Sequence, residues 1–294
     1  MGILLGLVTA LSWGSADLCA RFATRRIGTF RTMLYMQLSG LLLLTLFMPL
    51  LGGWGHLTDG SGPRVWVWGV LVGCLNTSSM LALYRSFEIG KMSIVAPVSA
   101  SYPVLTMLLS LLTGERLTLL RVLGMTLTIV GVVLVASGEK ITGDSNLIDP
   151  NTQPQKKTLG VGWALYSSAG FGVMFWLLGI RLVPMLGAIP SVWIIRLTGV
   201  VATTLIILAA RSSLAPPAKR DTLWILGIGV LDTSAYAFNN FGMKLEQISV
   251  VSVLASLYGA VTVALAALIL KERVSGLQWL GITCIFAGII LISR

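Results

Sequence analysis

The sequence predicts an all-α membrane protein with ten transmembrane helices, built as two inverted five-helix repeats. Three observations predict this fold. The 294 residues are 55% apolar and only 11% charged, with a mean hydropathy of +0.88, whereas a soluble domain carries about 25% charged residues. The apolar residues fall into runs long enough to cross a bilayer, which takes about 20 residues. The two halves of the chain also match each other in aromatic and polar residues.

The expected spans are apolar runs bounded by Gly, Pro or charged residues. They cover residues 2–22, 31–51, 65–87, 92–113, 118–137, 159–183, 189–211, 222–244, 249–270 and 276–293. The first run starts at the initiator methionine without a basic preamble, so we read it as a span and not as a cleavable leader. Pro97 and Pro103 are expected to bend the fourth span, since helix distortion is tolerated where the backbone faces a cavity or a neighbouring helix.

A polar stretch at residues 138–158 divides the chain nearly in half. It holds two prolines, several turn-forming residues and charges of both signs, which predicts a surface loop. The chain is therefore expected to contain a first five-helix repeat at 1–137, this connecting loop, and a second five-helix repeat at 159–294, all within one membrane domain.

An internal repeat supports this division. An offset of 156 residues pairs Trp68 with Trp224, Thr77 with Thr233, Ser78 with Ser234 and Tyr102 with Tyr258, and one residue later Glu115-Arg116 pairs with Glu272-Arg273. Each half holds five spans, an odd number, so the second half must enter the membrane in the opposite direction. Such inverted pairs are common among secondary transporters, because the two halves can exchange conformations around a midplane site.

Asp232 is the most informative polar residue at membrane depth. It lies near the middle of the eighth span, and its repeat mate in the third span is Asn76. Tyr236 and Asn239 follow it by four and seven residues, so all three share one helix face. Buried ionisable groups in membrane helices mark substrate pathways and proton relays, which predicts a substrate or proton-coupling site at the repeat interface. The alternative is a polar network that only holds the helices together.

Asp17 and Arg196 each allow two interpretations. Asp17 precedes Arg21 by four residues, so it either faces a cavity or forms a local ion pair along its own helix. Arg196 lies within the seventh span, where it either binds an anionic group or a structural partner. Tyr102 and Tyr258 are repeat mates deep in their spans, and they either line a cavity symmetrically or pack in the core.

These considerations define one set of expected site residues. The predicted substrate-binding residues are Trp13, Asp17, Asn76, Tyr102, Tyr166, Trp176, Asp232, Tyr236, Asn239 and Tyr258, and Asp232 is also the predicted proton-coupling residue. The three cysteines, Cys19, Cys74 and Cys284, fall within apolar runs and are expected to be free thiols.

Three segments carry a resemblance to a known family. They are Trp13-Gly14-Ser15, the stretch GERLTLLRVLGMTLTIVGVVL from Gly114, and its second copy KERVSGLQWLGITCIFAGIIL from Lys271. The chain resembles the ten-helix EamA-like branch of the drug/metabolite transporter superfamily over essentially its whole length. The resemblance implies the fold and secondary transport, but it leaves the substrate open among amino acids, metabolites, drugs and sugar derivatives. The family often has Arg in the second helix of each repeat, which Arg196 matches and Gln37 does not.

The orientation of the chain is a second departure. Bacterial relatives usually have both termini in the cytoplasm. Here fourteen of the 21 Lys and Arg residues fall in loops on the side opposite the termini, six fall on the side of the termini, and Arg196 lies inside a span. Because cytoplasmic loops carry an excess of positive charge, the count predicts that both termini lie outside.

The residue types exclude several other functions. The single histidine, His56, lies in a short loop, so neither an intramembrane Ser–His dyad nor a His-based metal site can be built, and no phosphate-binding glycine loop is present. The net charge of +10 comes from basic residues scattered singly or in pairs, which does not fit a nucleic-acid surface. No enzyme activity, cofactor, metal or nucleic-acid partner is expected.

The sequence thus predicts a cell-membrane secondary transporter that works by alternating access. The expected partners are a small-molecule substrate and the lipid bilayer, with a monomer sufficient. A small polar metabolite or amino acid ranks first as substrate, moved by proton-coupled export. Efflux of cationic drugs ranks second, and a lipid-translocating or channel-like protein stays open.

Overall fold

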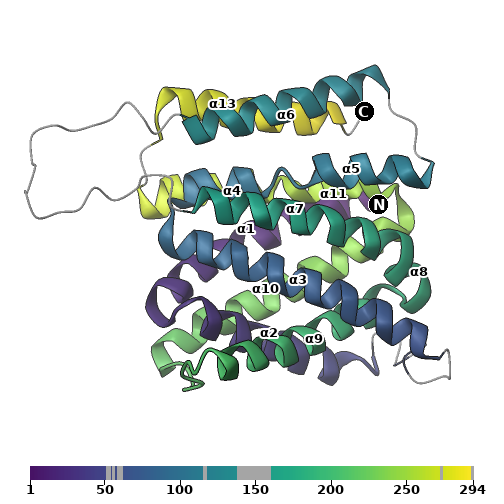
Figure 1. Ribbon diagram of the computed structural model, residues 1–294, viewed down its shortest axis with the longest axis vertical. Coiled ribbons are helices and arrows are strands. Elements are labelled where there is room, and N and C mark those ends of the chain that lie inside the picture. Colours follow the sequence, from purple (N-terminus) through teal and green to yellow (C-terminus); the bar gives the residue numbers. More distant parts are fainter. Residues whose placement is uncertain are drawn as a thin grey trace, which may run out of the picture.

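The computed structural model describes residues 1–50, 54, 57, 62–114, 118–137, 160–271 and 274–292, and over these residues every regular element is a helix (Figure 1). The expected loop at 138–158, the two Glu-Arg pairs and His56 lie outside the described residues. Seven of the helices are long and apolar enough to cross a membrane. Together with α6, α10 and α13 they complete ten spans, so the predicted ten-helix fold is confirmed.

The first half supplies five spans in chain order. They are α1 (Gly2–Ile27), α2 (Thr29–Phe47), α3 (Pro63–Ile89), the broken span α4 (Met92–Ser99), α5 (Pro103–Ser110) and η2 (Leu111–Thr113), and α6 (Leu119–Ser137). The second half repeats this order. Its spans are α7 (Val161–Leu177) with η4 (Leu178–Leu182) and α8 (Val183–Leu186), then α9 (Ala188–Ala209), α10 (Lys219–Leu245), the broken span α11 (Ile248–Ser256), α12 (Tyr258–Leu265) and η5 (Ala266–Leu270), and α13 (Gly276–Ile292).

Two glycines make the tightest reversals, at matching places in the halves. Gly28 joins α1 to α2 with φ +83°, and Gly187 joins α8 to α9 with φ +88°. A residue with a side chain rarely adopts such a positive φ, and glycine does so without steric cost. In each half, a single glycine therefore joins the first two spans and reverses the direction of the chain between them.

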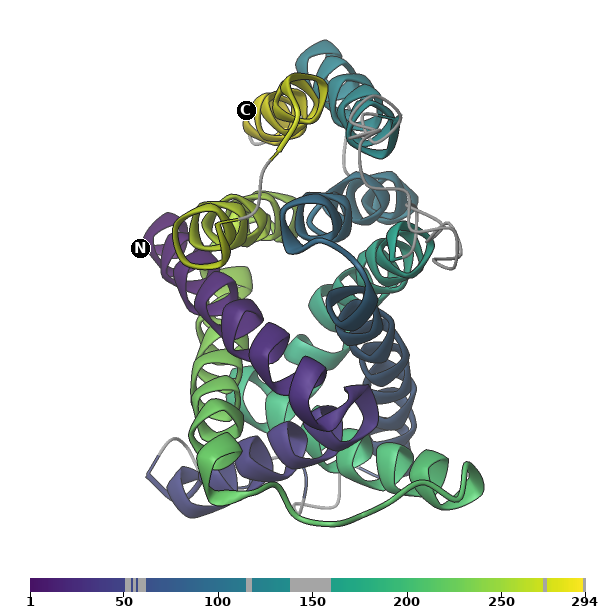
Figure 2. The same cartoon turned by 90° about the vertical axis from the view of Figure 1, so that its left-hand side faces the viewer.

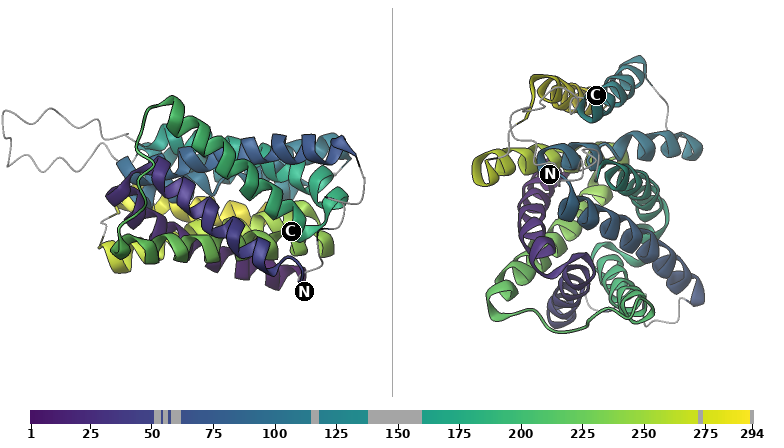
Figure 3. Two further views of the ribbon diagram at one scale, coloured as in Figure 1. Left: turned by 90° about the horizontal axis from the view of Figure 1, so that it is seen from below. Right: turned by 60° about the vertical axis from the view of Figure 1, so that its left-hand side comes forward.

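The helices pack with an approximate two-fold symmetry between the halves. α1 packs on α10, as α3 packs on α7, and α4 packs on α12, as α11 packs on α5. The mates α2 and α9, and the mates α6 and α13, contact each other directly. Figure 1 shows these contacts as successive levels, and Figure 2 shows the α6–α13 pair at one edge with the other spans grouped around a centre. The left view of Figure 3 shows, from below, that the long helices run roughly along one common direction.

Small residues set the closest helix contacts, also in matching pairs. A Cβ added at Gly73 of α3 would stand 2.6 Å from Cβ of Thr198 on α9, and one added at Gly229 of α10 would overlap Ser39 on α2. Because lipid tails are as apolar as leucine, helices in a membrane associate through such close van der Waals contact. The repeat seen in the sequence is thus a repeat of helix contacts.

Both broken spans interrupt at the same place in their repeat. α4 ends at Ser99, α5 begins at Pro103, and Pro97 lies inside α4, which confirms the predicted bend. In the second half α11 ends at Ser256 and α12 begins at Tyr258. The two breaks bring Tyr102 and Tyr258 to the middle of the molecule.

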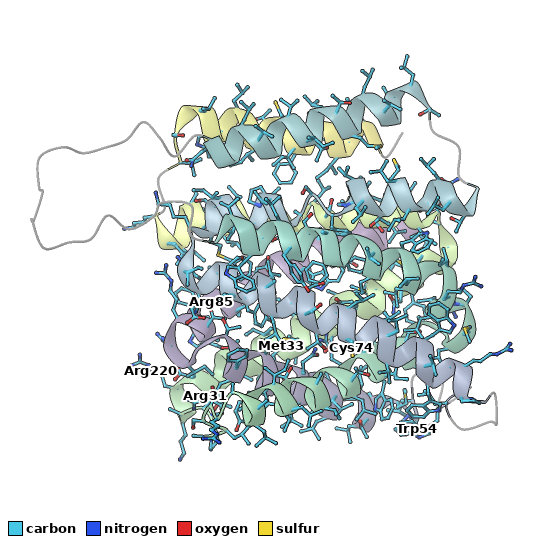
Figure 4. The ribbon with its side chains drawn as sticks, in the orientation of Figure 1. Arg31, Met33, Trp54, Cys74, Arg85 and Arg220 are labelled. Carbon is cyan, nitrogen blue, oxygen red and sulfur yellow. The ribbon has the colours of Figure 1, made fainter. Side chains whose placement is uncertain are left out.

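The charged ends of the helices bear on orientation. Figure 4 shows Arg31, Arg85 and Arg220 gathered at one end of the helices and Trp54 at the other. α1 begins, and α13 ends, at the end near Trp54. By the positive-inside rule, the arginine end of the helices stays predicted to be cytoplasmic, as the charge count predicts.

This orientation is testable with a reporter fused after Arg294. We expect alkaline phosphatase fused there to be active, because the enzyme folds only outside the cytoplasm, and a fluorescent protein at the same place to stay dark in a strain that exports it unfolded. A fluorescent C-terminal fusion with inactive phosphatase would instead show that both termini are cytoplasmic.

Candidate functional site

A small cavity lies at the centre of the helices, between the two halves. Its lining residues are Trp13, Ala16, Asp17, Met80, Leu83, Tyr84, Tyr102, Phe171, Phe175, Asp232, Tyr236 and Tyr258. The free space is about 30 Å³, which is room for one or two water molecules. The cavity therefore has no room for a larger molecule unless the surrounding helices move.

A fully buried ion pair stands at one side of the cavity. Nη2 of Arg196 on α9 donates to Oδ2 of Asp232 on α10, and Nη1 donates to Oε1 of Gln37 on α2 at 2.6 Å. Arg196 has no exposed surface. Gly40 and Gly199 make room for this group, because a Cβ at Gly40 would overlap Thr233 and crowd the arginine, while one at Gly199 would overlap Gln37.

Tyr236 connects the ion pair to the third span. Its hydroxyl donates to Oδ1 of Asn76 at 2.5 Å, and the guanidinium of Arg196 lies 5.2 Å from the centre of its ring. A guanidinium over an aromatic face is attracted by the negative potential of the ring. Asp232, Arg196, Tyr236 and Asn76 thus form one buried polar cluster.

Asp17 lies on another wall of the cavity, on α1. Its Oδ2 accepts a hydrogen bond from Oγ1 of Thr262 on α12 at 3.0 Å. Arg21, one turn further on, donates to the carbonyl oxygens of Phe87 and Gly90 at the end of α3, at 2.7 Å to Gly90. Of the two readings of Asp17, the geometry supports the cavity-facing one.

Aromatic rings make up most of the remaining wall. The ring of Trp13 lies 5.1 Å from that of Tyr236, 6.1 Å from Tyr258 and 5.6 Å from Phe175. The hydroxyl of Tyr102 donates to the carbonyl oxygen of Ser252 at 2.9 Å. The hydroxyl of its repeat mate Tyr258 is buried without a hydrogen-bond partner among the described residues, so the symmetry of the repeat is broken here.

Four hydrogen bonds around the centre join one half to the other. They run from Arg196 to Gln37, from Tyr236 to Asn76, from Thr262 to Asp17 and from Tyr102 to Ser252. Any rotation of one half against the other must therefore exchange these bonds, which couples the shape of the cavity to the relative position of the halves.

The structure brings most of the predicted site residues together. Trp13, Asp17, Tyr102, Asp232, Tyr236 and Tyr258 line the cavity, and Asn76 is bonded to Tyr236. The other three predicted residues lie elsewhere.

Those three residues have different surroundings. Asn239 is buried beyond the cavity, with its amide nitrogen 3.6 Å from Sδ of Met243. Trp176 is half-buried and does not line the cavity. Tyr166 is 54% exposed and lines a separate cleft of about 710 Å³ with Arg85 and Trp163. An apolar span does not reveal which of its faces meets lipid, because both faces are apolar.

Sequence reasoning missed several wall residues. Tyr84, Phe171 and Phe175 line the cavity, and Gln37 and Thr262 bind its charged groups. A signal existed for Tyr84, which follows Asn76 by eight residues and so shares its helix face. No spacing pattern pointed to Thr262, which lies 245 residues from Asp17.

Over the part of the chain that is described, no three His, Cys, Asp or Glu residues come together in a group that could hold a metal ion. Ten apolar spans, a two-fold internal repeat and a small cavity with buried charged groups at the repeat interface define a membrane transporter of the inverted-repeat class.

Comparison with known proteins gives the family. The model of the EamA-like transporter family matches residues 1–137 and 158–294, so the chain belongs to the EamA-like transporter family. It is 27% identical over 135 residues to the uncharacterized protein MJ1333.1 of Methanocaldococcus jannaschii, which covers 46% of this chain and 95% of the relative. A solved structure, titled only as the crystal structure of a protein, aligns over 99% of this chain and 95% of its own with a TM-score of 0.70 at 18% identity, which supports the fold.

Proposed function

We propose that the protein is a secondary transporter of the cell membrane that exports a small metabolite by alternating access through the central cavity. The observation that carries this proposal is a small cavity whose wall comes from both halves and whose polar contacts cross between them. A passive channel needs a continuous polar lining. A cavity with room for one or two waters fits a carrier that is closed between two open states.

Proton coupling is part of the proposal, through Asp232. Its charge is neutralised by Arg196, and the groups that face the pair are Gln37, Tyr236 and, across the cavity, Asp17. Protonation of Asp232 would remove its negative charge and release Arg196 from it. Because Arg196 also binds Gln37 of the other half, a proton at Asp232 would change the contact between the halves.

The experiment needs no knowledge of the substrate. Ala16 lines the cavity and is 4% exposed, so an Ala16→Cys variant with the three native cysteines replaced reports access to the cavity. Alternating access predicts that an impermeant methanethiosulfonate reagent modifies this cysteine both in right-side-out and in inside-out vesicles. The ratio of the two rates should depend on pH, and Asp232→Asn should abolish that dependence.

Two results would contradict the proposal. Modification from one side only, at every pH, would show a fixed pocket and not a carrier. An unchanged pH dependence in Asp232→Asn would remove proton coupling through this residue and leave alternating access standing. A cysteine at Leu4, 57% exposed on the lipid-facing surface of α1, is the control for reagent that partitions into lipid.

A further inference from the structure

The two carboxylates of the central cavity differ in their partners. Asp232 is paired with Arg196, so this side of the cavity carries no net charge. Asp17 is 6% exposed, accepts one hydrogen bond from Thr262 and, over the described part of the chain, forms no ion pair. Burial without a cationic partner disfavours the charged form of a carboxyl group, so a cation that enters the cavity stabilises the ionised form of Asp17 and pairs with it.

The wall around Asp17 suits a cation and offers no positively charged partner to an anionic group of the ligand. No Lys, Arg or His is among the residues that line the cavity, whereas seven of the twelve are aromatic. The faces of aromatic rings attract ammonium groups and bury apolar groups. Trp13, one turn before Asp17, brings its ring against Tyr236 and Tyr258.

Tyr258 adds a second, independent indication of a ligand. Its side chain is 4% exposed and lines the cavity, and its hydroxyl is buried without a described hydrogen-bond partner. Buried hydroxyl groups normally form a hydrogen bond. A buried hydroxyl without one, at the wall of a cavity, is therefore a place where a ligand or a water molecule can form it. An ammonium group only donates hydrogen bonds. The oxygen of this hydroxyl has free lone pairs and can accept one of them.

We propose, building on the transport function above, that the substrate is an organic amine with one cationic nitrogen and an apolar body. The ammonium group binds the carboxylate of Asp17 and donates to the hydroxyl of Tyr258, and the apolar body lies against the rings. An amino acid fits less well, because its carboxylate would need a cation and Arg196 is already held by Asp232 and Gln37.

The test compares four molecules that share one phenyl ring and a two-carbon chain. They are phenethylamine, phenylalanine, 3-phenylpropionate and 2-phenylethanol, which are cationic, zwitterionic, anionic and neutral at pH 7. The purified full-length protein in detergent is titrated with each, and binding is measured by the shift of its melting temperature and by calorimetry. We expect phenethylamine to bind at least tenfold more tightly than the other three.

Three variants assign the binding to the proposed atoms. Asp17→Asn should weaken phenethylamine binding by about ten- to a hundredfold, the effect of losing a hydrogen bond to a charged group. Asp17→Glu keeps the charge and should restore most of the affinity. Tyr258→Phe removes only the hydroxyl and should weaken binding severalfold. Asp221→Asn removes a carboxylate outside the cavity and should change nothing.

The outcomes separate this inference from the transport proposal. Three results would overturn the amine substrate. The first is that phenylalanine, 3-phenylpropionate or 2-phenylethanol binds as tightly as phenethylamine or more tightly. The second is that Asp17→Asn and Tyr258→Phe leave the affinity for phenethylamine unchanged, and the third is that none of the four molecules binds. None of these results touches alternating access, because the cysteine experiment uses no substrate. If Asp17→Asn fails to fold, Tyr258→Phe decides alone.

Discussion

Replacing Arg196 by Met should lower the free energy of unfolding by about 3–5 kcal/mol, the usual cost of removing one partner of a buried ion pair. The variant leaves the charge of Asp232 inside the protein, where it is 3% exposed, and leaves Gln37 without its hydrogen bond to the guanidinium. Equilibrium unfolding in detergent, followed by the fluorescence of the tryptophans, measures the loss.

Two further variants serve as controls for this effect. Arg196→Met combined with Asp232→Leu removes both charges and should recover most of the stability, since apolar replacement of a whole buried pair is often neutral. Arg26→Met breaks the peripheral pair of Arg26 with Asp221, 3.1 Å apart and one-third exposed on the arginine side, and should cost about 1 kcal/mol or less. A double variant as unstable as the single one would show that the shape of Arg196, and not its charge balance, holds the centre together.

Adding one methyl group at Gly131 or Gly288 should destabilise the protein by about 1–3 kcal/mol, the range for overpacking a tight contact. A Cβ at Gly131 would stand 2.6 Å from the carbonyl oxygen of Gly281, and one at Gly288 would stand 2.5 Å from that of Gly124. These obstacles are backbone atoms, so no side chain can turn aside to relieve them. α6 and α13 would have to move apart.

A glycine in open surroundings provides the matched control. A Cβ at Gly162, in the helix α7, meets nothing within 4 Å. Gly162→Ala should leave stability unchanged or raise it by up to about 1 kcal/mol, because alanine favours the helix over glycine. Equal melting temperatures for Gly131→Ala and Gly162→Ala would show that the contact between α6 and α13 is looser than the structure describes.

The sequence allowed the spans to be predicted closely, and the site only in part. Hydropathy fixes where a helix crosses lipid, and the internal repeat fixes how the halves correspond. The rotation of each helix about its axis is hidden, because a face against lipid and a face against protein are equally apolar. Depth and polarity therefore identified Asp17 and Asp232, but not that Arg196 neutralises one of them and leaves the other for Thr262.

The same limit explains the misplaced aromatic residue. Tyr166 is an aromatic residue within an apolar run, as Tyr102 is, yet it faces outward while Tyr102 is 1% exposed. The break between α4 and α5, which turns Tyr102 inward, has a proline signal in the sequence. Nothing comparable marks the orientation of α7.

The α6–α13 pair supplies no residue to the wall of the cavity. It connects the last span of each half through glycines that interlock backbone against backbone. This contact joins the two halves without involving any residue of the central cavity. Its packing is therefore set by the contact of the two helices alone, and the cavity wall places no demand on its sequence.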